Sequence, residues 1–196
     1  MKIKAAFALF GLLGAIVSCN TETKEEQASV GASVEVDSVE LVKRGGYLVT
    51  VGGCNDCHSP KVMTAHGPAP DTSRLLSGYD PSRPFVGFDK ATALSGTMVV
   101  FNIESTAAAG PWGISYAANL TPDDTGIGSW TFEQFRRAMK EGKWKGLEDS
   151  RPLLPPMPWP NFKDVGDEDL AAIFAYLKSI KPVNNPIPAP VTPDAI

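Results

Sequence analysis

The chain has 196 residues, of which 43% are hydrophobic and 20% charged, which suits one globular domain with tails. Gly (18) and Pro (17) are both abundant, so much of this domain is expected to be loop. The net charge of −4 argues against a nucleic-acid partner, because binding to a phosphate backbone requires a basic face.

The first 18 residues are typical of a bacterial lipoprotein signal peptide. Lys2 and Lys4 precede an apolar run over 5–17, which is shorter than the ~20 residues of a membrane-spanning helix. The run ends at Cys19 in a context that resembles the lipobox, so Cys19 is the predicted lipidation site. A plain secretory signal or an uncleaved anchor is the alternative. Residues 19–36 are polar and are predicted to form a flexible tether.

The next segment combines a predicted helix with a cysteine motif. The helix is expected over 38–53, because Asp37 and Glu40 form a capping pattern. It leads into Cys54-Asn55-Asp56-Cys57-His58, the Cys-x-x-Cys-His pattern of covalent haem attachment. Residues three apart on a helical turn face the same way, so the thiols of Cys54 and Cys57 can reach one porphyrin edge. His58 is then the predicted proximal iron ligand, and one motif predicts one haem c.

Other uses of two closely spaced cysteines fit the sequence less well. A thioredoxin-like redox site requires a βαβ context, which the sequence pattern does not offer. A structural zinc site requires four ligands, and only His66 follows nearby. A disulfide between Cys54 and Cys57 is possible in an oxidising compartment, but it leaves His58 without a role.

The stretch from residue 59 to residue 130 has no regular pattern. Only 97–103 has the character of a strand, because Met98, Val99, Val100, Phe101 and Ile103 cluster there. An irregular stretch of this length is expected to surround a bound group, and a haem would be such a group.

Two further helices are predicted after this stretch. The helix over 131–141 begins with a capping box of Thr131 and Gln134 and ends at Gly142. The helix over 167–180 begins with three acidic residues, which favour the positive end of its dipole, and ends before Pro182. Their apolar faces are formed by Phe132, Phe135 and Met139 in the first, and by Leu170, Ile173, Phe174 and Leu177 in the second.

Five side chains are candidates for the second axial ligand. They are Met63, His66, Met98, Met139 and Met157. Met139 lies on an apolar helix face, which favours core packing. Met63 and His66 follow the motif so closely that the opposite haem face is hard to reach. Met157 is the predicted distal ligand, because the proline-rich segment 153–160 would hold a weak thioether stiffly; packing under a loop is the alternative.

The order of these features resembles class I cytochrome c, and more closely the cytochrome subunits of membrane-bound alcohol and sugar dehydrogenases. The likeness extends over about 45–183. It rests on Asn119-Leu120-Thr121-Pro122-Asp123, Gly126-Ile127-Gly128, Leu154-Pro155-Pro156-Met157-Pro158 and Asp167-Glu168-Asp169-Leu170 with Tyr176-Leu177. The resemblance implies a mainly α, class I cytochrome c fold over 37–183. About three to five helices would surround one covalent haem, with long loops and a Pro-rich tail over 184–196.

The resemblance also implies roles for individual residues. Trp130 and Arg151 are candidates for holding the haem propionates, with core packing and a solvated surface charge as the respective alternatives. Gly46 and Tyr47 resemble the residues by which the first helix crosses the last, near Tyr176.

The expected function is single-electron transfer, without catalysis by the chain itself. A carrier of this type would face the periplasm of a bacterial cell envelope, anchored by lipid on Cys19. Its redox partners would be a dehydrogenase, a quinol-oxidising complex or a terminal oxidase. The alternatives are an electron-accepting subunit of a dehydrogenase complex, or a sensor or peroxidase with an open iron position.

Overall fold

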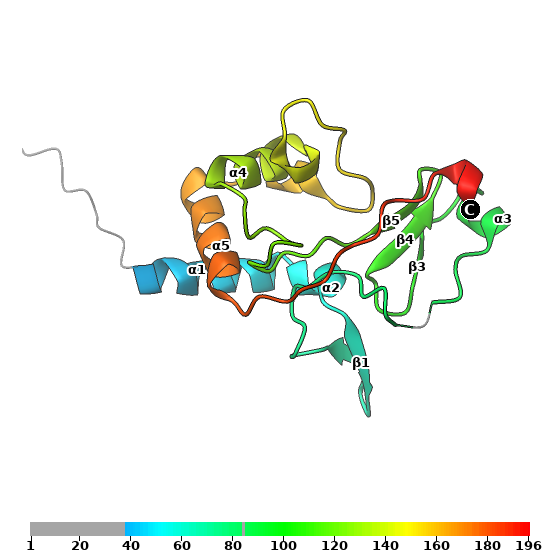
Figure 1. The fold of residues 1–196 in the computed structure, drawn as a ribbon, viewed down its shortest axis with the longest axis horizontal. Coiled ribbons are helices and arrows are strands. Elements are labelled where there is room, and N and C mark those ends of the chain that lie inside the picture. The colour runs from blue at the N-terminus through cyan, green and yellow to red at the C-terminus, as the bar shows by residue number, and fades with distance from the viewer. Residues whose placement is uncertain (1–37, 84) are drawn as a thin grey trace, which may run out of the picture. The chain divides into compact units, whose positions relative to one another are not determined.

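The computed structural model describes residues 38–83 and 85–196, which belong to one compact unit. The predicted signal peptide (1–18), Cys19 and the tether (19–36) lie outside the described residues. Within the described part, every helix is too short or too polar to cross a bilayer. Helices dominate the regular structure there, in agreement with the predicted mainly α class (Figure 1).

Helical segments occur along the whole described chain. The α-helices are α1 (Ser38–Val51), α2 (Cys54–His58), α3 (Lys90–Ala93), α4 (Phe132–Glu141) and α5 (Asp167–Ser179). The 3-10 helices are η1 (Trp144–Gly146), η2 (Trp159–Phe162) and η3 (Pro193–Ala195). The three predicted helices correspond to α1, α4 and α5, and each end lies within two residues of its predicted position.

The contact between α1 and α5 depends on the absence of side chains on α1. A Cβ atom on Gly45 would lie only 1.9 Å from the carbonyl oxygen of Ala172, so only glycine permits this approach. Gly46 lies beside the ring of Tyr176, as the resemblance implied, whereas Tyr47 is 58% exposed. Gly45, which sequence reasoning missed, approaches α5 more closely than Gly46 does.

Helix α4 has the predicted ends. The Thr131 hydroxyl accepts from the Gln134 amide, and the Gln134 side chain accepts from the Thr131 amide, which together form the capping box. Gly142 closes the helix in the left-handed conformation with φ 65°. Local sequence alone thus accounts for where α4 begins and ends.

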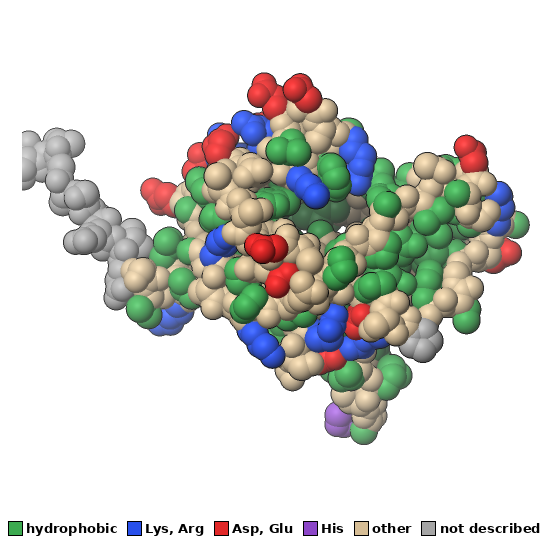
Figure 2. All heavy atoms as spheres, viewed as in Figure 1, with side chains coloured by type: hydrophobic (Ala, Val, Ile, Leu, Met, Phe, Trp, Pro, Cys, Tyr) green, Lys and Arg blue, Asp and Glu red, His purple; other side chains and the backbone are tan. Residues whose placement is uncertain are grey.

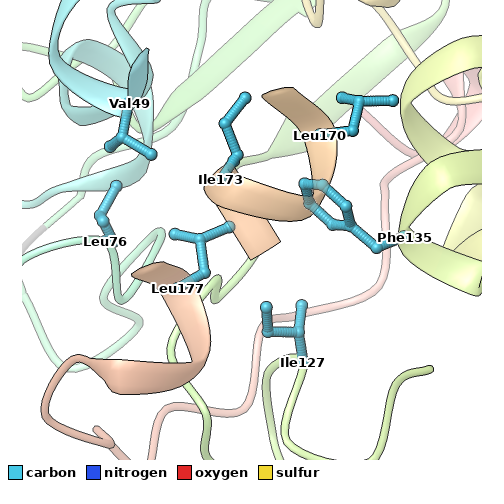
Figure 3. Packing of buried hydrophobic residues seen from close by; sticks show 7 residues of the cluster. All are labelled: Val49, Leu76, Ile127, Phe135, Leu170, Ile173 and Leu177. Atoms are coloured by element: carbon cyan, nitrogen blue, oxygen red, sulfur yellow. The ribbon is translucent and has the colours of Figure 1, made fainter. Parts of the chain in front are cut away.

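A single apolar cluster joins the three long helices to two loops (Figure 3). Leu170, Ile173 and Leu177 contribute the buried face of α5, in agreement with the predicted periodicity. The other buried members are Val49, Leu76, Ile127 and Phe135. Cys54, Trp130 and Met139 pack against this cluster, so the motif and α4 share one core.

The stretch 59–130 contains more strand than predicted. A hairpin of β1 (Lys61–Thr64) and β2 (Gly67–Pro70) is followed by a three-stranded antiparallel sheet. This sheet has the order β3 (Val100–Phe101), β4 (Ala107–Gly110), β5 (Gly113–Tyr116). The expectation that only 97–103 had strand character was wrong.

Two of the missed strands, β2 and β4, lack the usual sequence pattern of strands. β4 is three alanines and a glycine, all buried, and β2 contains two prolines, so neither shows the expected β-branched residues. Pairing and burial, which are not local properties, determine these strands. The predicted strand region 97–103 contributes only two residues, in β3.

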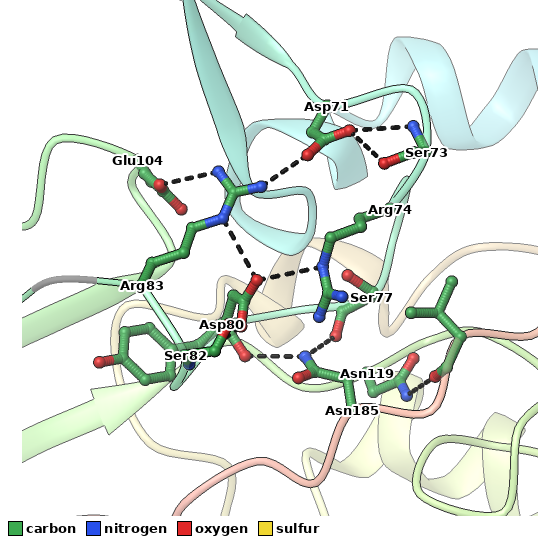
Figure 4. Close-up of polar contacts among 12 residues, drawn as sticks. Asp71, Ser73, Arg74, Ser77, Asp80, Ser82, Arg83, Glu104, Asn119 and Asn185 are labelled. Carbon is green, nitrogen blue, oxygen red and sulfur yellow. Dashed lines mark hydrogen bonds and ion pairs between the residues drawn. The ribbon is translucent and has the colours of Figure 1, made fainter.

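One arginine organises the loop between β2 and the sheet (Figure 4). The Arg83 guanidinium contacts Asp71 at 2.6 Å, Asp80 at 3.2 Å and Glu104 at 3.0 Å. Its Nη1 also donates to the Lys61 carbonyl at 2.6 Å. Because these groups come from four places in the chain, Arg83 holds the long loop together at its base.

The C-terminal segment runs extended from α5 to the edge of β5 (Figure 1). Near its start, the Asn119 side chain donates to the Val183 carbonyl at 2.8 Å, and further along Ile114 and Val191 exchange two backbone hydrogen bonds. Between them, Asn185 is buried, with 3% exposure. The proline-rich composition indicated an extended tail but not these attachments to the domain.

Candidate functional site

The Cys-x-x-Cys-His motif forms its own short helix. Gly53 adopts φ +66°, a conformation that separates α1 from α2 and that few other residues tolerate. Cys54 and Cys57 are one helical turn apart in α2, and neither is in a disulfide. The motif therefore has the helical geometry predicted for presenting two thiols in one direction.

Burial disfavours the thiolate form of both cysteines. Burial raises the pKa of the Cys54 thiol, which packs against the apolar core, and the neighbouring Asp56 carboxylate adds to this effect. Burial also raises the pKa of Cys57. These neutral thiols are not arranged as an activated redox pair, whose thiolates would require a lowered pKa.

His58 is oriented by a backbone carbonyl far away in the sequence. Its Nδ1 lies 2.8 Å from the carbonyl oxygen of Ala118, which can only accept, so Nδ1 carries the proton and donates. The lone pair of the neutral ring is then on Nε2. Burial lowers the pKa of His58, which further favours this neutral form. A metal-binding imidazole typically has this outer hydrogen bond, because it fixes both the tautomer and the ring orientation.

The backbone around His58 is held by the loop that follows the hairpin. The Gly78 amide donates to the His58 carbonyl at 2.7 Å, and the Tyr79 amide donates to Ala117, next to Ala118, at 3.0 Å. The buried Ser59 hydroxyl accepts from the Leu76 amide at 2.8 Å. The loop 76–79 thus fixes both the imidazole-bearing residue and the segment that accepts its Nδ1 proton.

Lys61 caps the C-terminal end of α2. Its Nζ donates to the carbonyl oxygens of Asn55 at 3.1 Å, Asp56 at 2.9 Å and Ser59 at 2.5 Å. Burial lowers the pKa of this lysine. Sequence reasoning missed Lys61, although a cation just after a helix end is a recognisable signal for capping.

Trp130 lines a hollow of about 360 Å³ together with Lys145, Leu147 and Pro186. The residues that line this hollow are both polar and apolar. On the face drawn in Figure 2, the molecule is hollowed below α4, with hydrophobic and basic side chains beside the opening. Arg151 is not among the residues that line the hollow; its guanidinium lies over the ring of Trp144, 5.0 Å from the centroid. The structure therefore places Trp130, but not Arg151, at this hollow.

The candidates for a second axial ligand are now separated by their environments. Met63 and Met98 are 69% and 52% exposed, and His66 lies at the exposed turn of the β1–β2 hairpin. Met139 packs in the core, as its position on α4 indicated. Met157 is partly buried in an irregular segment with a cis bond between Pro155 and Pro156.

The segment that carries Met157 is attached to the sheet. The Ser115 hydroxyl, on β5, donates to the Pro155 carbonyl at 2.6 Å. The Leu153 amide donates to the Gly142 carbonyl at 2.6 Å, which attaches the same segment to the end of α4. Sequence reasoning missed Ser115, since no local pattern connects residues 40 positions apart.

These residues fit a covalently attached haem. The two thiols are unpaired and adjacent on one helical turn, and the Nε2 lone pair of the next residue, His58, is free to bind iron. In residues 38–83 and 85–196, no three His, Cys, Asp or Glu side chains gather as ligands of one metal ion. The thiols and the imidazole therefore do not share one centre, which a tetrahedral site would require.

No protein-family profile matches the chain. It is similar to the cytochrome c subunit of gluconate 2-dehydrogenase from Pantoea cypripedii, with 32% identity over 73% of this chain and 24% of the relative. It is 31% identical to the cytochrome c subunit of alcohol dehydrogenase (quinone) from Gluconacetobacter polyoxogenes, over 74% of this chain and 23% of the relative. It is 37% identical to the fructose dehydrogenase cytochrome subunit from Gluconobacter japonicus, over 75% of this chain and 23% of the relative.

The chain thus spans about a quarter of the length of these relatives. Its homologues are cytochrome subunits of dehydrogenases that act on alcohols, gluconate and fructose, which confirms the resemblance predicted from the sequence motifs.

Proposed function

We propose that this chain is a monohaem c-type cytochrome that transfers single electrons and does not itself catalyse a reaction. The observation that carries the proposal is the hydrogen bond from His58 Nδ1 to Ala118, directly beside the unpaired thiols of Cys54 and Cys57. The similarity to cytochrome subunits supports the same assignment. Haem c, when bound, supplies iron that changes between the ferrous and ferric states.

The residues of α2 would hold the cofactor on its proximal side. The sulfur atoms of Cys54 and Cys57 would form the two thioether bonds, and His58 would bind the iron through Nε2. The hydrogen bond to the Ala118 carbonyl would hold the imidazole in one orientation with the haem bound, which would limit rearrangement during electron transfer. Trp130 and Arg151 stay candidates for contacts with the propionates.

Met157 would be the distal ligand. Three other candidates are exposed or on the exposed hairpin, and Met139 packs in the core. If His58 and Met157 both bind the iron, they would exclude small ligands. A thioether ligand stabilises ferrous iron, and the apolar cluster beside Cys54 would disfavour additional positive charge, so both effects would raise the reduction potential.

The relatives and the N-terminal sequence support a proposal for the partners and the location. A dehydrogenase is the favoured electron donor, since the homologues are dehydrogenase subunits. A quinol-oxidising complex or a terminal oxidase would be the other partners. Lipid on Cys19 would anchor the chain in a bacterial envelope membrane, with the domain facing the periplasm.

The haem assignment is tested by covalent attachment. Protein expressed with cytochrome c maturation should show one haem per chain by its pyridine haemochrome spectrum, and should keep the haem after denaturing electrophoresis. Double replacement of Cys54 and Cys57 by alanine should abolish both signals, whereas replacement of the exposed Met63 by alanine should not. Absence of covalent haem in the unmodified protein would refute the proposal.

The axial ligands are tested by spectroscopy. The ferric protein should show the weak near-infrared sulfur-to-iron band, which Met157→Ala should abolish and Met63→Ala should retain. Rapid binding of carbon monoxide to the unmodified ferrous protein at neutral pH would instead indicate an open iron position, and hence a sensor or a peroxidase. Mass spectrometry of the membrane fraction tests the anchor: an acylated Cys19 at the mature N-terminus is expected.

A further inference from the structure

The segment that carries Met157 has few means of fixing its own backbone. Four prolines lie between residues 155 and 160, and proline has no amide hydrogen to donate. The amide of Met157 itself reaches only the Leu154 carbonyl, at a long 3.4 Å. The Leu153 amide attaches the start of the segment to α4, but the prolines that follow leave residues 155–160 few amides, so donors from elsewhere in the protein must hold their carbonyl groups.

Ser115 is such a donor. Its hydroxyl group lies 2.6 Å from the carbonyl oxygen of Pro155, two residues before Met157. Ser115 is 9% exposed, so water competes little for this hydrogen bond. The contact joins the third strand of the sheet to the backbone that leads directly into the predicted iron ligand.

The direction of the Ser115 hydroxyl is set by a tryptophan. The Trp112 Nε1 donates to Ser115 Oγ at 3.2 Å, and an indole nitrogen can only donate. The hydroxyl therefore accepts from Trp112 and keeps its single proton for a carbonyl. The Pro155 carbonyl at 2.6 Å is favoured over that of Ala108 at 3.4 Å.

The strand that carries Ser115 is held in place by contacts on both sides of this residue. On one side of Ser115, Ile114 exchanges hydrogen bonds of 2.8 and 3.0 Å with Val191. On the other side, the ring of Tyr116 packs on that of Tyr79, with centroids 4.6 Å apart. A donor on a rigid element can hold its acceptor to a narrow position, which a donor on a mobile loop cannot.

We propose that Ser115 is a positioning residue for the distal ligand: it holds the Pro155 carbonyl so that the Met157 thioether stays on the iron. The three-stranded sheet β3–β5, for which sequence reasoning found no role, then serves as the support of the distal side. This inference rests on the proposed role of Met157, and it adds the group that keeps that ligand in place.

Three variants of the full haem-loaded protein test the inference. Ser115→Ala removes the donor, and Ser115→Thr keeps a hydroxyl on a residue that strands favour. Ser150→Ala is the matched control, because the Ser150 hydroxyl also donates to a carbonyl, that of Leu147 at 2.7 Å, but in the preceding loop. For each variant, the sulfur-to-iron band and the global unfolding are followed by absorbance and circular dichroism during heating.

For Ser115→Ala, the temperature at which the band is lost should fall about 3 °C further below the temperature of global unfolding than it does in the unmodified protein, as expected for the loss of one hydrogen bond. Ser115→Thr should return the difference between these two temperatures to that of the unmodified protein, and Ser150→Ala should leave the difference unchanged. If Ser115→Ala lowers both temperatures equally, Ser115 is merely structural and the inference is wrong. An unchanged band temperature overturns it as well.

Two further measurements cover the case in which Ser115→Ala does not fold and the case in which Met157 is not the ligand. If Ser115→Ala fails to fold, Trp112→Phe removes only the group that directs the hydroxyl, and it should lower the band temperature in the same sense; no effect would contradict the inference. Met157→Ala tests the underlying assignment separately. A band that persists in Met157→Ala means that another residue is the ligand, and both proposals then fail, whereas loss there with no response at Ser115 removes only the positioning role.

Discussion

The side-chain amide of Asn185 donates to two backbone carbonyls at once, that of Ser77 at 2.7 Å and that of Tyr79 at 2.8 Å. These carbonyls flank Gly78, whose amide donates to the His58 carbonyl. Figure 4 shows Asn185 beside Ser77. One buried residue of the C-terminal segment thus fixes the loop whose Gly78 amide holds the histidine of the motif.

Replacement of Asn185 by alanine should lower the free energy of unfolding by about 2 kcal/mol. Two buried carbonyls would then lack a donor, and each unsatisfied buried group is destabilising. Urea denaturation of the haem-loaded protein measures the change. The adjacent Asn184 is the control, because it is exposed and makes only a 3.5 Å contact with Asp123. Asn184→Ala should have almost no effect, and equal effects of the two variants would contradict this reasoning.

Two neighbouring glycines in α1 should differ sharply in their tolerance of alanine. A Cβ at Gly45 would lie 1.9 Å from the backbone oxygen of Ala172, which cannot move aside without shifting α5. Gly45→Ala should therefore cost about 3 kcal/mol of unfolding free energy through overpacking. At Gly46 the nearest atom is on the Tyr176 ring at 3.0 Å, and alanine favours the helix, so Gly46→Ala should cost less than about 1 kcal/mol. An equal loss of unfolding free energy at both positions would show that α1 and α5 do not approach each other this closely at Gly45.

The ionic cluster around Arg83 should make the protein sensitive to acid. Burial raises the pKa of the Asp80 carboxyl, but hydrogen bonds from Ser82 and the charges of Arg74 and Arg83 outweigh it, so the pKa lies below its ordinary value. A folded-state pKa below the unfolded one gives stability that is present above pH ~4 and is lost as the pH falls through the folded value. Unfolding free energies measured from pH 7 to pH 2 should therefore decrease below about pH 5.

The Asp80→Asn variant tests whether Asp80 causes this decrease of stability at low pH. The variant should be less stable at pH 7, because Arg74 and Arg83 lose a charged partner, and it should show a flatter decrease in acid. Parallel curves for the two proteins would mean that other carboxyl groups cause the loss.

Lys61→Met should weaken the end of α2 without disturbing the core. Three carbonyl groups lose a charged donor, so a loss of about 2 kcal/mol in unfolding free energy is expected. Lys43→Met is the control, since Lys43 is exposed and makes only a 3.6 Å ion pair with Glu40 on the surface. A Lys61 variant as stable as the control would show that water replaces the capping donor.

The features that could be predicted from sequence are those set by neighbouring residues. The capping box of Thr131 and Gln134, the stop at Gly142 and the helical turn of the motif all depend on contacts within four positions. The apolar period of α5 likewise indicated its buried face correctly. Each of these is a local pattern with one favoured structure.

The features that escaped prediction depend on contacts between distant residues. The carbonyl partner of His58 is 60 residues away, and that of Ser115 is 40 residues away, so no window of sequence contains either pair. The buried alanines of β4 carry no strand pattern of their own. Gly45 and Gly46 are identical neighbouring residues, so the sequence cannot show that they lie at different distances from α5; that difference depends on how the helices pack.

The β1–β2 hairpin is closed at its base by the Asp71 amide, which donates to the Pro60 carbonyl at 2.8 Å. Its turn, between Thr64 and Gly67, is exposed, and the φ of +105° at Gly67 requires that this glycine be kept. The turn is thus a permissive position for inserted peptide. An affinity tag, or a cysteine for attachment to an electrode, could be placed at this exposed turn, which is close along the chain to the proposed ligand His58.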